Sequence, residues 1–383
     1  MVPLNGPKIR LTRPVTGPEE LDAVREVLES GHLAQGPRAR AFERAIEQRC
    51  AARHAVATSS CTTALHLALA ALGVGPGDEV AVADFTFPAT ANAVIQQGAA
   101  VVPVDIDPDT YAMDPADLER RITPRTKAVI VVDPLGSPAD HAAIAAIARA
   151  HNLRTIDDAA TAIGGECRGL PIGANAHSDI TCFSFHARKV ITTGEGGALT
   201  TNDDTLAETC RTLRAHGGVR VENRFRFEHA GFNYRLSDIQ AAIGLVQLER
   251  LDGILAARRE RSLALSDRLA PLAEAAGVRL PADPPWGRHL YQSYVVRLPD
   301  RADRDAVIRR LAALGIESTI GTYAVHAEPI YARLCGTQPG DLPASWHARR
   351  SCLTLPMHPG LTDADLDTIA AGLADALAEQ GVP

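Results

Sequence analysis

From residue 55 onward, short apolar runs alternate with stretches of helical periodicity, and this alternation constrains the fold more than any other feature. The apolar runs are Ala55–Thr58, Glu79–Ala83, Ala100–Val104, Ala128–Val132, Arg154–Ile156, Ile180–Phe183 and Ala198–Thr200. Helix-like stretches lie between them, at Thr63–Leu72, Thr90–Gln97 and Ala139–His151. Strands at this spacing, separated by helices, predict a mainly parallel α/β sheet covered on both faces. In such a sheet the ligand site is expected at the carboxyl ends of the strands.

The remainder of the chain predicts a second, smaller domain. A long helical pattern runs from about Ser237 to Ala275, with a break expected near Asp252-Gly253. It is followed by patterns of strand, helix, strand and helix at Tyr291–Arg297, Asp303–Leu314, Ile316–Ile320 and Asp363–Leu377. A chain of 383 residues is also long for one domain. We expect a large domain over residues 1–250 with an N-terminal segment. A small α+β domain is expected over residues 251–383, including the long connecting helix.

Charge and composition argue against several classes of protein. A net charge of −7 argues against a general nucleic-acid binder, because a phosphate backbone needs a basic face. No apolar run approaches the roughly 18 residues of a membrane span, and the first residues lack the apolar stretch of a signal peptide. The seven cysteines form no CxxC pair, which favours free thiols in a reducing compartment. We expect a cytoplasmic protein that binds neither nucleic acid nor a membrane.

The segment Ser59–Leu65 follows a predicted strand and opens a predicted helix. Small hydroxylated residues at such a junction cap the helix, and the free amides of its first turn point outward. A helix N-terminus of this kind can hold a phosphate group. Taken alone, the segment is explained more simply by helix capping.

Two acids, Asp157 and Asp158, end a predicted strand within the segment Thr155–Thr161. A buried acid at the carboxyl edge of a sheet needs a cationic partner. A protonated pyridine nitrogen would be a suitable partner. The alternative is that both acids cap the loop that follows.

Lys189 lies shortly after the strand that contains Cys182 and Phe183, and just before the glycine-rich stretch Thr192–Gly197. The other lysines are Lys8, near the N-terminus, and Lys127, before a strand. A lysine that is partly desolvated near other cations has a lowered pKa and becomes an amine nucleophile. The alternative is an exposed loop lysine.

A fourth segment, Gly231–Ala242, begins a helix with Ser237 as its N-cap and by itself indicates only a helix entry. Together, and in this order, the four segments resemble the DegT/DnrJ/EryC1/StrS family of sugar aminotransferases. The resemblance extends from Gly31–Pro37 to Leu355–Gly360. It implies an aspartate-aminotransferase-like fold, fold type I, and pyridoxal 5′-phosphate as cofactor. It also implies a homodimer with composite active sites.

The resemblance assigns roles to individual positions of this chain. Lys189 occupies the place of the lysine that carries the cofactor as a Schiff base, and Asp158 that of the acid paired with the pyridine nitrogen. Phe87 fits the aromatic residue that stacks on the cofactor ring. The remaining cofactor-binding positions are Thr62, Thr63 and Ser184 at the phosphate, and Asn233 donated to the phosphate across the dimer interface.

Several positions depart from the family pattern. Thr161 stands where many members carry Gln or His near the ring hydroxyl of the cofactor, and we retain it as a cofactor contact. Cys61 replaces the usual Gly of the phosphate turn, and Val132–Gly136 replaces the commoner His-Leu-Tyr-Gly pattern. Members that dehydrate sugars have His at the lysine position, so Lys189 argues against that branch.

The resemblance also suggests substrate contacts. The stretch Gly321–His326 borders the sugar pocket in family members, so Tyr323 and His326 are candidates, with a packing role as the alternative. Arg235, like Arg188, is a candidate for a diphosphate, and an ordinary salt bridge is the alternative. No metal ligand set is expected.

The implied activity is transfer of an amino group, with L-glutamate as donor, to a nucleotide-linked keto-sugar. One alternative keeps the cofactor and changes the substrate to a keto-cyclitol of the inosose type. A second alternative is a non-catalytic regulatory protein on the same fold.

Overall fold

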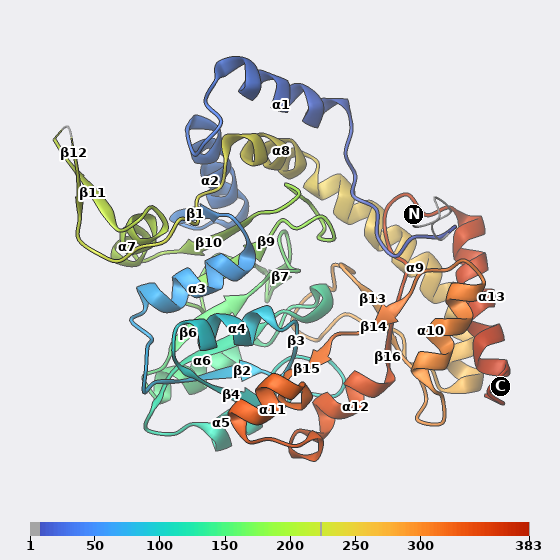
Figure 1. The fold of residues 1–383 in the computed structure, drawn as a ribbon. Coiled ribbons are helices and arrows are strands. Elements are labelled where there is room, and N and C mark those ends of the chain that lie inside the picture. Colours follow the sequence, from blue (N-terminus) through green and yellow to red (C-terminus); the bar gives the residue numbers. More distant parts are fainter. Residues whose placement is uncertain (1–7, 223, 383) are drawn as a thin grey trace.

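A seven-stranded sheet forms the centre of the computed structural model, which describes residues 8–222 and 224–382 (Figure 1). In spatial order its strands are β1 (His54–Thr58), β10 (Gly197–Thr201), β9 (Ile180–Ser184), β6 (Arg154–Asp158), β5 (Thr126–Val132), β2 (Glu79–Ala83) and β4 (Ala100–Val104). Strand β10 pairs antiparallel with both of its neighbours, and the other pairs are parallel. The predicted mainly parallel sheet is therefore confirmed.

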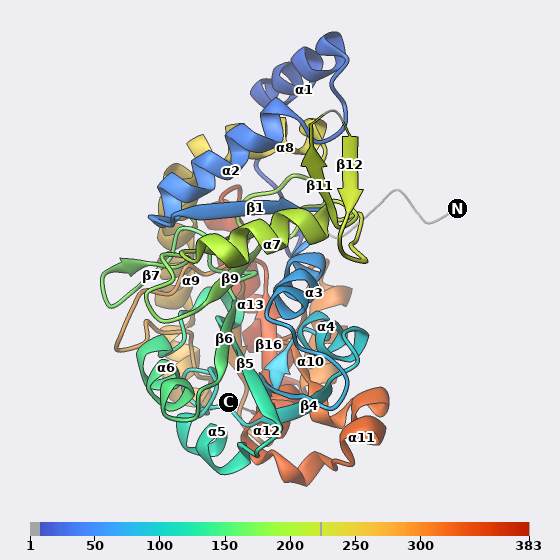
Figure 2. The same cartoon turned by 90° about the vertical axis from the view of Figure 1, so that its left-hand side faces the viewer.

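Helices cover both faces of this sheet (Figure 2). The helices α3 (Cys61–Ala71), α4 (Ala89–Gln96) and α7 (Asp204–Arg214) cover one face, and α5 (Pro115–Arg121) and α6 (His141–Ala150) cover the other. Strand β2 shows the alternation that this arrangement demands, because successive side chains of a strand point to opposite faces. Val80 and Val82 belong to the apolar core on the side of α3, whereas Ala81 and Ala83 belong to the core on the side of α6.

The N-terminal segment packs beside β1, where three helices lie close in space. They are α1 (Pro18–Ser30), α2 (Pro37–Cys50) and, from later in the chain, α8 (Asp238–Glu249). A methyl group added at Gly244 would lie 2.6 Å from the ring of Phe42, so a glycine lets α8 approach α2 closely. A hairpin of β11 (Gly218–Val221) and β12 (Arg224–Phe227) projects away from the body of the molecule (Figure 1).

The C-terminal part is an α+β unit around a three-stranded antiparallel sheet. Its strands, in spatial order, are β13 (Tyr294–Arg297), β16 (Cys352–Leu355) and β14 (Thr319–Ile320). Its long helices are α9 (Leu251–Ala276), α10 (Arg304–Ala313) and α13 (Asp363–Ala378). The short elements α11 (Pro329–Cys335) and α12 (Pro343–Ser351) lie toward the large sheet, and β15 (Tyr323–Ala324) pairs with β3 (Phe85–Thr86).

The remaining short elements are β7 (Glu166–Cys167), β8 (Leu170–Pro171), η1 (Pro134–Gly136), η2 (Val325–Ala327) and η3 (Pro339–Asp341). Within the described ranges, no helix combines the length and the apolarity that a bilayer span demands.

Three details differ from the sequence-based expectation. The long helical pattern breaks at Arg250, between α8 and α9, and not at Asp252-Gly253. The strand predicted over Ile316–Ile320 forms a ladder only at its last two residues. The central strand of the small sheet, β16, has no counterpart among the predicted elements. The division of the chain into domains near residue 250 stays a prediction.

Candidate active site

A cavity of about 460 Å³ lies at the carboxyl ends of the central strands, between the large sheet and the C-terminal part. It is lined by residues far apart in the sequence, from Leu11 to Met357. The sequence-predicted residues that line it are Thr62, Phe87, Asp158, Thr161, Ser184, Arg188, Lys189 and Tyr323. The structure therefore gathers most of the predicted site into one place.

The first turn of α3 forms one wall of the cavity. Ser60 caps this helix, because its hydroxyl oxygen accepts a hydrogen bond from the Thr63 amide at 3.1 Å. The Thr63 hydroxyl is also used within the cap, since it accepts from the Ser60 amide at 3.0 Å. The cap thus leaves the amides of Cys61 and Thr62 for an outside acceptor. A helix N-terminus with free amides is suited to an anion such as phosphate.

A glycine in β10 allows this turn to sit where it does. A Cβ atom at Gly197 would lie 2.3 Å from the carbonyl carbon of Ser60, so no larger residue fits without displacing the turn. On the other side, the Ser59 amide donates to the carbonyl oxygen of Tyr234 at 2.9 Å. The backbone on both sides thus fixes the entry to α3.

Asp158 ends β6 and is buried in the wall of the cavity. One carboxylate oxygen accepts from the Thr90 hydroxyl at 2.7 Å, and the other from the Ala160 amide at 3.3 Å and the Cys61 thiol at 3.9 Å. Burial raises the pKa of the Asp158 carboxyl, while the Thr90 hydroxyl and the charge of Lys189 act in the opposite direction. No salt bridge to Asp158 is present among residues 8–222 and 224–382.

Lys189 follows β9 in a tight turn, in which its amide donates to the carbonyl oxygen of His186 at 2.9 Å. Its side chain lines the cavity that Asp158 also lines. Burial lowers the pKa of the Lys189 amine, and the charge of Arg188 lowers it further, although Cys61 and Asp158 oppose this. A lysine with a lowered pKa has a larger fraction of free amine, the form that attacks carbonyl groups.

Asp157 faces the opposite side of the sheet from Asp158 and belongs to a buried cluster with Asp133 and His141. The His141 Nε2 atom lies 2.8 Å from Asp133 Oδ1 and 3.8 Å from Asp157 Oδ2. Burial disfavours charge on His141, but Asp157 and Asp133 outweigh it and raise the pKa of His141 to about 10. A protonated His141 donates its Nε2–H to Asp133. The cluster is therefore an internal ion pair that holds Asp133 in place.

Thr161 binds the neighbouring loop. Its hydroxyl donates to the Asp133 carbonyl oxygen at 2.6 Å and accepts from the Gly136 amide at 3.0 Å. Leu135, between them, has a positive φ of 61°, a conformation that costs energy for a residue with a Cβ. Thr161 lines the cavity, and its hydroxyl oxygen keeps one lone pair beside these two bonds, so a cofactor contact there stays a prediction.

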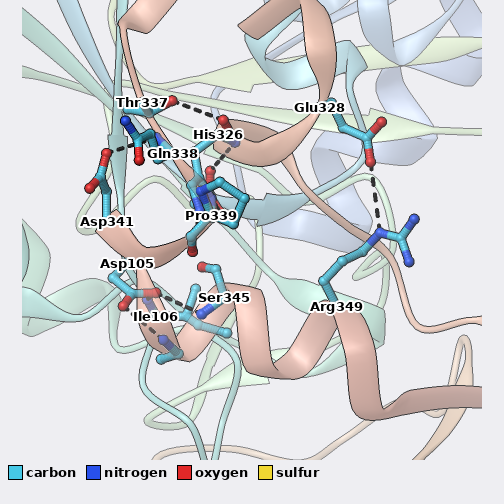
Figure 3. Close-up of polar contacts among 12 residues, drawn as sticks. Asp105, Ile106, His326, Glu328, Thr337, Gln338, Pro339, Asp341, Ser345 and Arg349 are labelled. Atoms are coloured by element: carbon cyan, nitrogen blue, oxygen red, sulfur yellow. Dashed lines mark hydrogen bonds and ion pairs between the residues drawn. The ribbon is translucent and has the colours of Figure 1, made fainter. Parts of the chain in front are cut away.

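Other candidate residues do not line the cavity. His326 is fully buried and hydrogen-bonded, so its side chain cannot contact a substrate in the cavity (Figure 3). Thr63 is occupied in the helix cap, as described above. Asn233 is exposed outside the cavity, and Arg235 is partly buried in a short backbone bridge with Thr58. Neither Asn233 nor Arg235 therefore lines the cavity of its own chain.

Sequence reasoning also missed residues that line the cavity. Thr90 binds Asp158, and Gln292 and Ser293 approach from the C-terminal part. Thr90 lies at the start of a predicted helix, where a threonine is ordinary, and Gln292 lies within a predicted strand. No spacing or composition singles them out, because only the folded chain brings them to the cavity.

Comparison with known proteins agrees with this geometry. The family model described as "DegT/DnrJ/EryC1/StrS aminotransferase family" matches residues 14–374. The chain belongs to this family. GDP-perosamine synthase from Caulobacter vibrioides is 44% identical over 374 residues, which cover 97% of this chain and 99% of that protein. This protein is accordingly an aminotransferase.

Solved structures extend the same relationship. The aminotransferase TlmJ from Streptoalloteichus hindustanus superposes with a TM-score of 0.90 at 34% identity, covering 97% of this chain and 100% of that one. The sugar aminotransferase Spr1654 from Streptococcus pneumoniae, in its PLP form, superposes with a TM-score of 0.89 at 28% identity. That match covers 97% of this chain and 99% of the other. The Spr1654 structure was also solved in a PMP form, so members of the family use pyridoxal phosphate.

The residues present here fit that cofactor. The buried Asp158 carboxylate receives only neutral donors, so a pyridinium N–H would supply the positive charge that the carboxylate needs. Free amides at the start of α3 suit the phosphate, and the Lys189 amine lines the same cavity. The aromatic ring of Phe87, 58% exposed at the cavity wall, has an open face for a stacked ring.

Proposed function

We propose that this aminotransferase uses pyridoxal 5′-phosphate to transfer an amino group from L-glutamate to a keto-sugar carried on a nucleoside diphosphate. One observation carries the proposal: Lys189, Asp158 and the free end of α3 line a single cavity. The similarity to GDP-perosamine synthase supports a sugar nucleotide as substrate, because that match covers almost the whole of both chains.

In this proposal the chain's own residues hold the cofactor at three places. The amides of Cys61 and Thr62, with the hydroxyls of Thr62 and Ser184, hold the phosphate. Asp158 keeps the pyridine nitrogen protonated, and Thr90 keeps Asp158 oriented at 2.7 Å. Phe87 stacks on the ring. Thr161 acts chiefly by holding the loop at Asp133, because its hydroxyl hydrogen is already donated there.

When bound, pyridoxal phosphate supplies an electron sink for the charge left on the donor carbon. Lys189 first holds the cofactor through its Nζ atom. Once free, the Lys189 amine would accept a proton from the donor's α-carbon on its Nζ atom and would return it within the same cavity. The same amine moves the proton in the reverse direction when the keto-sugar is the acceptor. One residue thus serves both halves, which predicts ping-pong kinetics.

We further propose a homodimer in which each chain completes the other's site. Asn233 is exposed near the base of the β11–β12 hairpin, and that hairpin projects from the body (Figure 1). Phe225 and Phe227 on the hairpin are 65% and 68% exposed, which is unusual for large apolar side chains on a free surface. A second copy of the chain would cover them and receive Asn233. Arg235 stays a candidate for the diphosphate.

The activity is tested by incubating the purified protein with pyridoxal phosphate, L-glutamate and a panel of keto-sugar nucleotides. Mass spectrometry of the products should show one amino sugar nucleotide and an equal amount of 2-oxoglutarate. In the reverse direction, GDP-perosamine with 2-oxoglutarate tests one specific product. Absence of amino transfer with every sugar would contradict the proposal.

A keto-cyclitol is the second candidate substrate, and thermal unfolding distinguishes the two. A nucleoside diphosphate should raise the melting temperature of the holoenzyme if the substrate is nucleotide-linked. For the dimer, the variants Lys189→Ala and Asn233→Ala are unfolded, mixed and refolded together. Regain of activity in the mixture, above that of either variant alone, supports a residue donated between subunits.

A further inference from the structure

A buried ion pair joins the C-terminal part to the large domain close to the mouth of the cavity. His326 Nδ1 lies 2.6 Å from Asp84 Oδ2, and the His326 backbone amide donates to Asp84 Oδ1, also at 2.6 Å. Both side chains have no exposed surface. Asp84 follows β2 in the large sheet and His326 lies in η2, so this two-point contact spans 242 residues of sequence.

The imidazole ring of His326 is held on its other side as well. Its Nε2 atom lies 3.2 Å from the carbonyl oxygen of Pro339, and the Thr337 hydroxyl donates to the His326 carbonyl oxygen at 2.8 Å (Figure 3). A carboxylate and a carbonyl oxygen both accept, so both ring nitrogens donate and the ring is protonated. The ring cannot turn toward the cavity without breaking these bonds.

The ion pair lies at the end of a strand pair that is too short to be stable by itself. Strand β15 meets β3 through two residue pairs, Tyr323 with Thr86 and Ala324 with Phe85. An isolated ladder is marginal in water even when it is longer. Since the Val325 amide also donates to the Asp84 carbonyl oxygen at 3.0 Å, the contact with Asp84 directly extends this ladder.

The strand pair carries two aromatic rings that line the cavity. Tyr323, in β15, meets Phe87, which follows β3, edge to face with their centroids 6.1 Å apart. The Arg349 guanidinium lies 5.7 Å from the Tyr323 centroid. Phe87 is fixed to the large domain, whereas Tyr323 belongs to the C-terminal part. Their separation therefore depends on what holds β15 against β3.

We propose that His326 is a positioning residue: through Asp84 it fixes Tyr323 beside Phe87 and so sets the width of the cavity mouth through which the sugar substrate enters. The statement that a sugar substrate enters through this mouth rests on the proposed function. The position of Tyr323 does not, and it is tested separately below. The role of His326 is thus indirect, through the backbone that it holds.

The first test is hydrogen–deuterium exchange of the holoenzyme, compared between the unchanged protein and His326→Ala. The backbone amides of residues 319–325 should exchange about tenfold faster in the variant, because the short ladder loses its anchor. Amides of residues 58–72, at the phosphate turn, should be unchanged. His326→Asn keeps a side-chain N–H for Asp84 and should restore slow exchange in part.

The chain provides a matched control. The Tyr331 hydroxyl donates to Asn92 Oδ1 at 2.7 Å and also joins the C-terminal part to the large domain, but Tyr331 does not line the cavity. Tyr331→Phe should leave exchange in residues 319–325 unchanged. Equal acceleration in both variants would overturn the proposal, since it would show general loosening. Unchanged exchange in His326→Ala would overturn it as well.

The second test separates the two half-reactions. In His326→Ala, conversion of the cofactor by L-glutamate, followed by absorbance, should stay within about twofold of the unchanged protein. The KM for the sugar nucleotide should rise about tenfold, with kcat much less affected. An equal loss in both half-reactions would contradict a role at the mouth. Failure of the unchanged protein to transfer any amino group would count against the proposed function, and the exchange result would still decide the role of His326.

Discussion

The Thr90 hydroxyl donates a hydrogen bond to the Oδ2 atom of Asp158 at 2.7 Å, in a part of the cavity wall where both residues are buried. The Thr90 oxygen also lies 3.0 Å from the Thr86 hydroxyl. The two hydroxyls can therefore donate in series toward the carboxylate, which favours its ionised form. These two hydroxyls link Asp158, the acid proposed to bind the cofactor ring, to β3. Strand β3 in turn pairs with β15 of the C-terminal part.

Replacement of Thr90 should therefore slow the reaction. Thr90→Val keeps the shape and removes the hydroxyl, and a hydrogen bond to a charged group contributes about 1.5–3 kcal/mol. We expect kcat to fall by roughly ten- to a hundredfold on that basis, with the cofactor still bound. Thr90→Ser, which keeps the hydroxyl, is the control. Equal rates for the Val and Ser variants would exclude the role of this hydrogen bond.

Lys189→Ala should abolish turnover while the protein still binds pyridoxal phosphate noncovalently, because the phosphate and ring contacts remain. Equilibrium dialysis measures the binding, and formation of 2-oxoglutarate from L-glutamate measures the activity. Lys127→Ala, which removes a lysine paired with Asp78 outside the cavity, should be fully active. Normal turnover of Lys189→Ala would remove this residue from the mechanism.

The two neighbouring acids should behave differently. Asp158→Asn should lower kcat about a hundredfold or more, because the ring nitrogen loses its negatively charged partner. Asp157→Asn should chiefly lower stability, since Asp157 lies in the cluster with His141 on the other face of the sheet. Steady-state kinetics and thermal unfolding of both variants measure this. A large rate loss in Asp157→Asn alone would instead make Asp157 the partner of the ring nitrogen.

Thr161→Val should destabilise the fold by about 1–3 kcal/mol, because Asp133 and Gly136 both lose a hydrogen-bond partner in a largely buried loop. Cofactor affinity should stay within about twofold of the unchanged protein. Chemical denaturation and cofactor titration provide the two numbers. Thr368→Val, on an exposed helix face, is a control that should change neither. Weak cofactor binding at unchanged stability would instead show that Thr161 contacts the cofactor.

The His141 cluster predicts a stability that depends on pH. The pKa of His141 is raised from 6.5 to about 10 because the charges of Asp157 and Asp133 outweigh the effect of burial. A group with a raised folded pKa stabilises fully below its unfolded pKa, and that contribution is lost as pH rises through the folded pKa. The free energy of unfolding should therefore decrease between pH 6.5 and about 10.

His141→Gln removes one partner of the buried ion pair and should cost about 3–5 kcal/mol at pH 6.5. The decrease in stability above that pH should be much smaller in the variant. Urea unfolding at several pH values measures both effects. His151→Gln, at a half-exposed pair with Glu119, should retain the pH dependence of the unchanged protein. A flat profile in the unchanged protein would contradict a protonated His141.

By itself the sequence determined the order of the main strands and helices of the large sheet along the chain, and it predicted Lys189 and Asp158 as central site residues. Both depend on local information. Alternating apolar runs specify strands and helices, and the short segments around Lys189 and Asp158 resemble one family wherever they occur. The same local information could not place β16 in the small sheet, because its neighbours β13 and β14 come from distant parts of the chain.

Only the tertiary structure decided which side chains share the cavity. Thr90 and Asp158 are 68 residues apart and meet because β6 and the start of α4 converge at one edge of the sheet. His326 had the right neighbours in sequence to contact a substrate, yet its bond to Asp84 directs it away from the cavity. Sequence patterns fix which residues lie on an element. The direction of each side chain, and the partner that buries it, depend on packing between elements far apart in the chain.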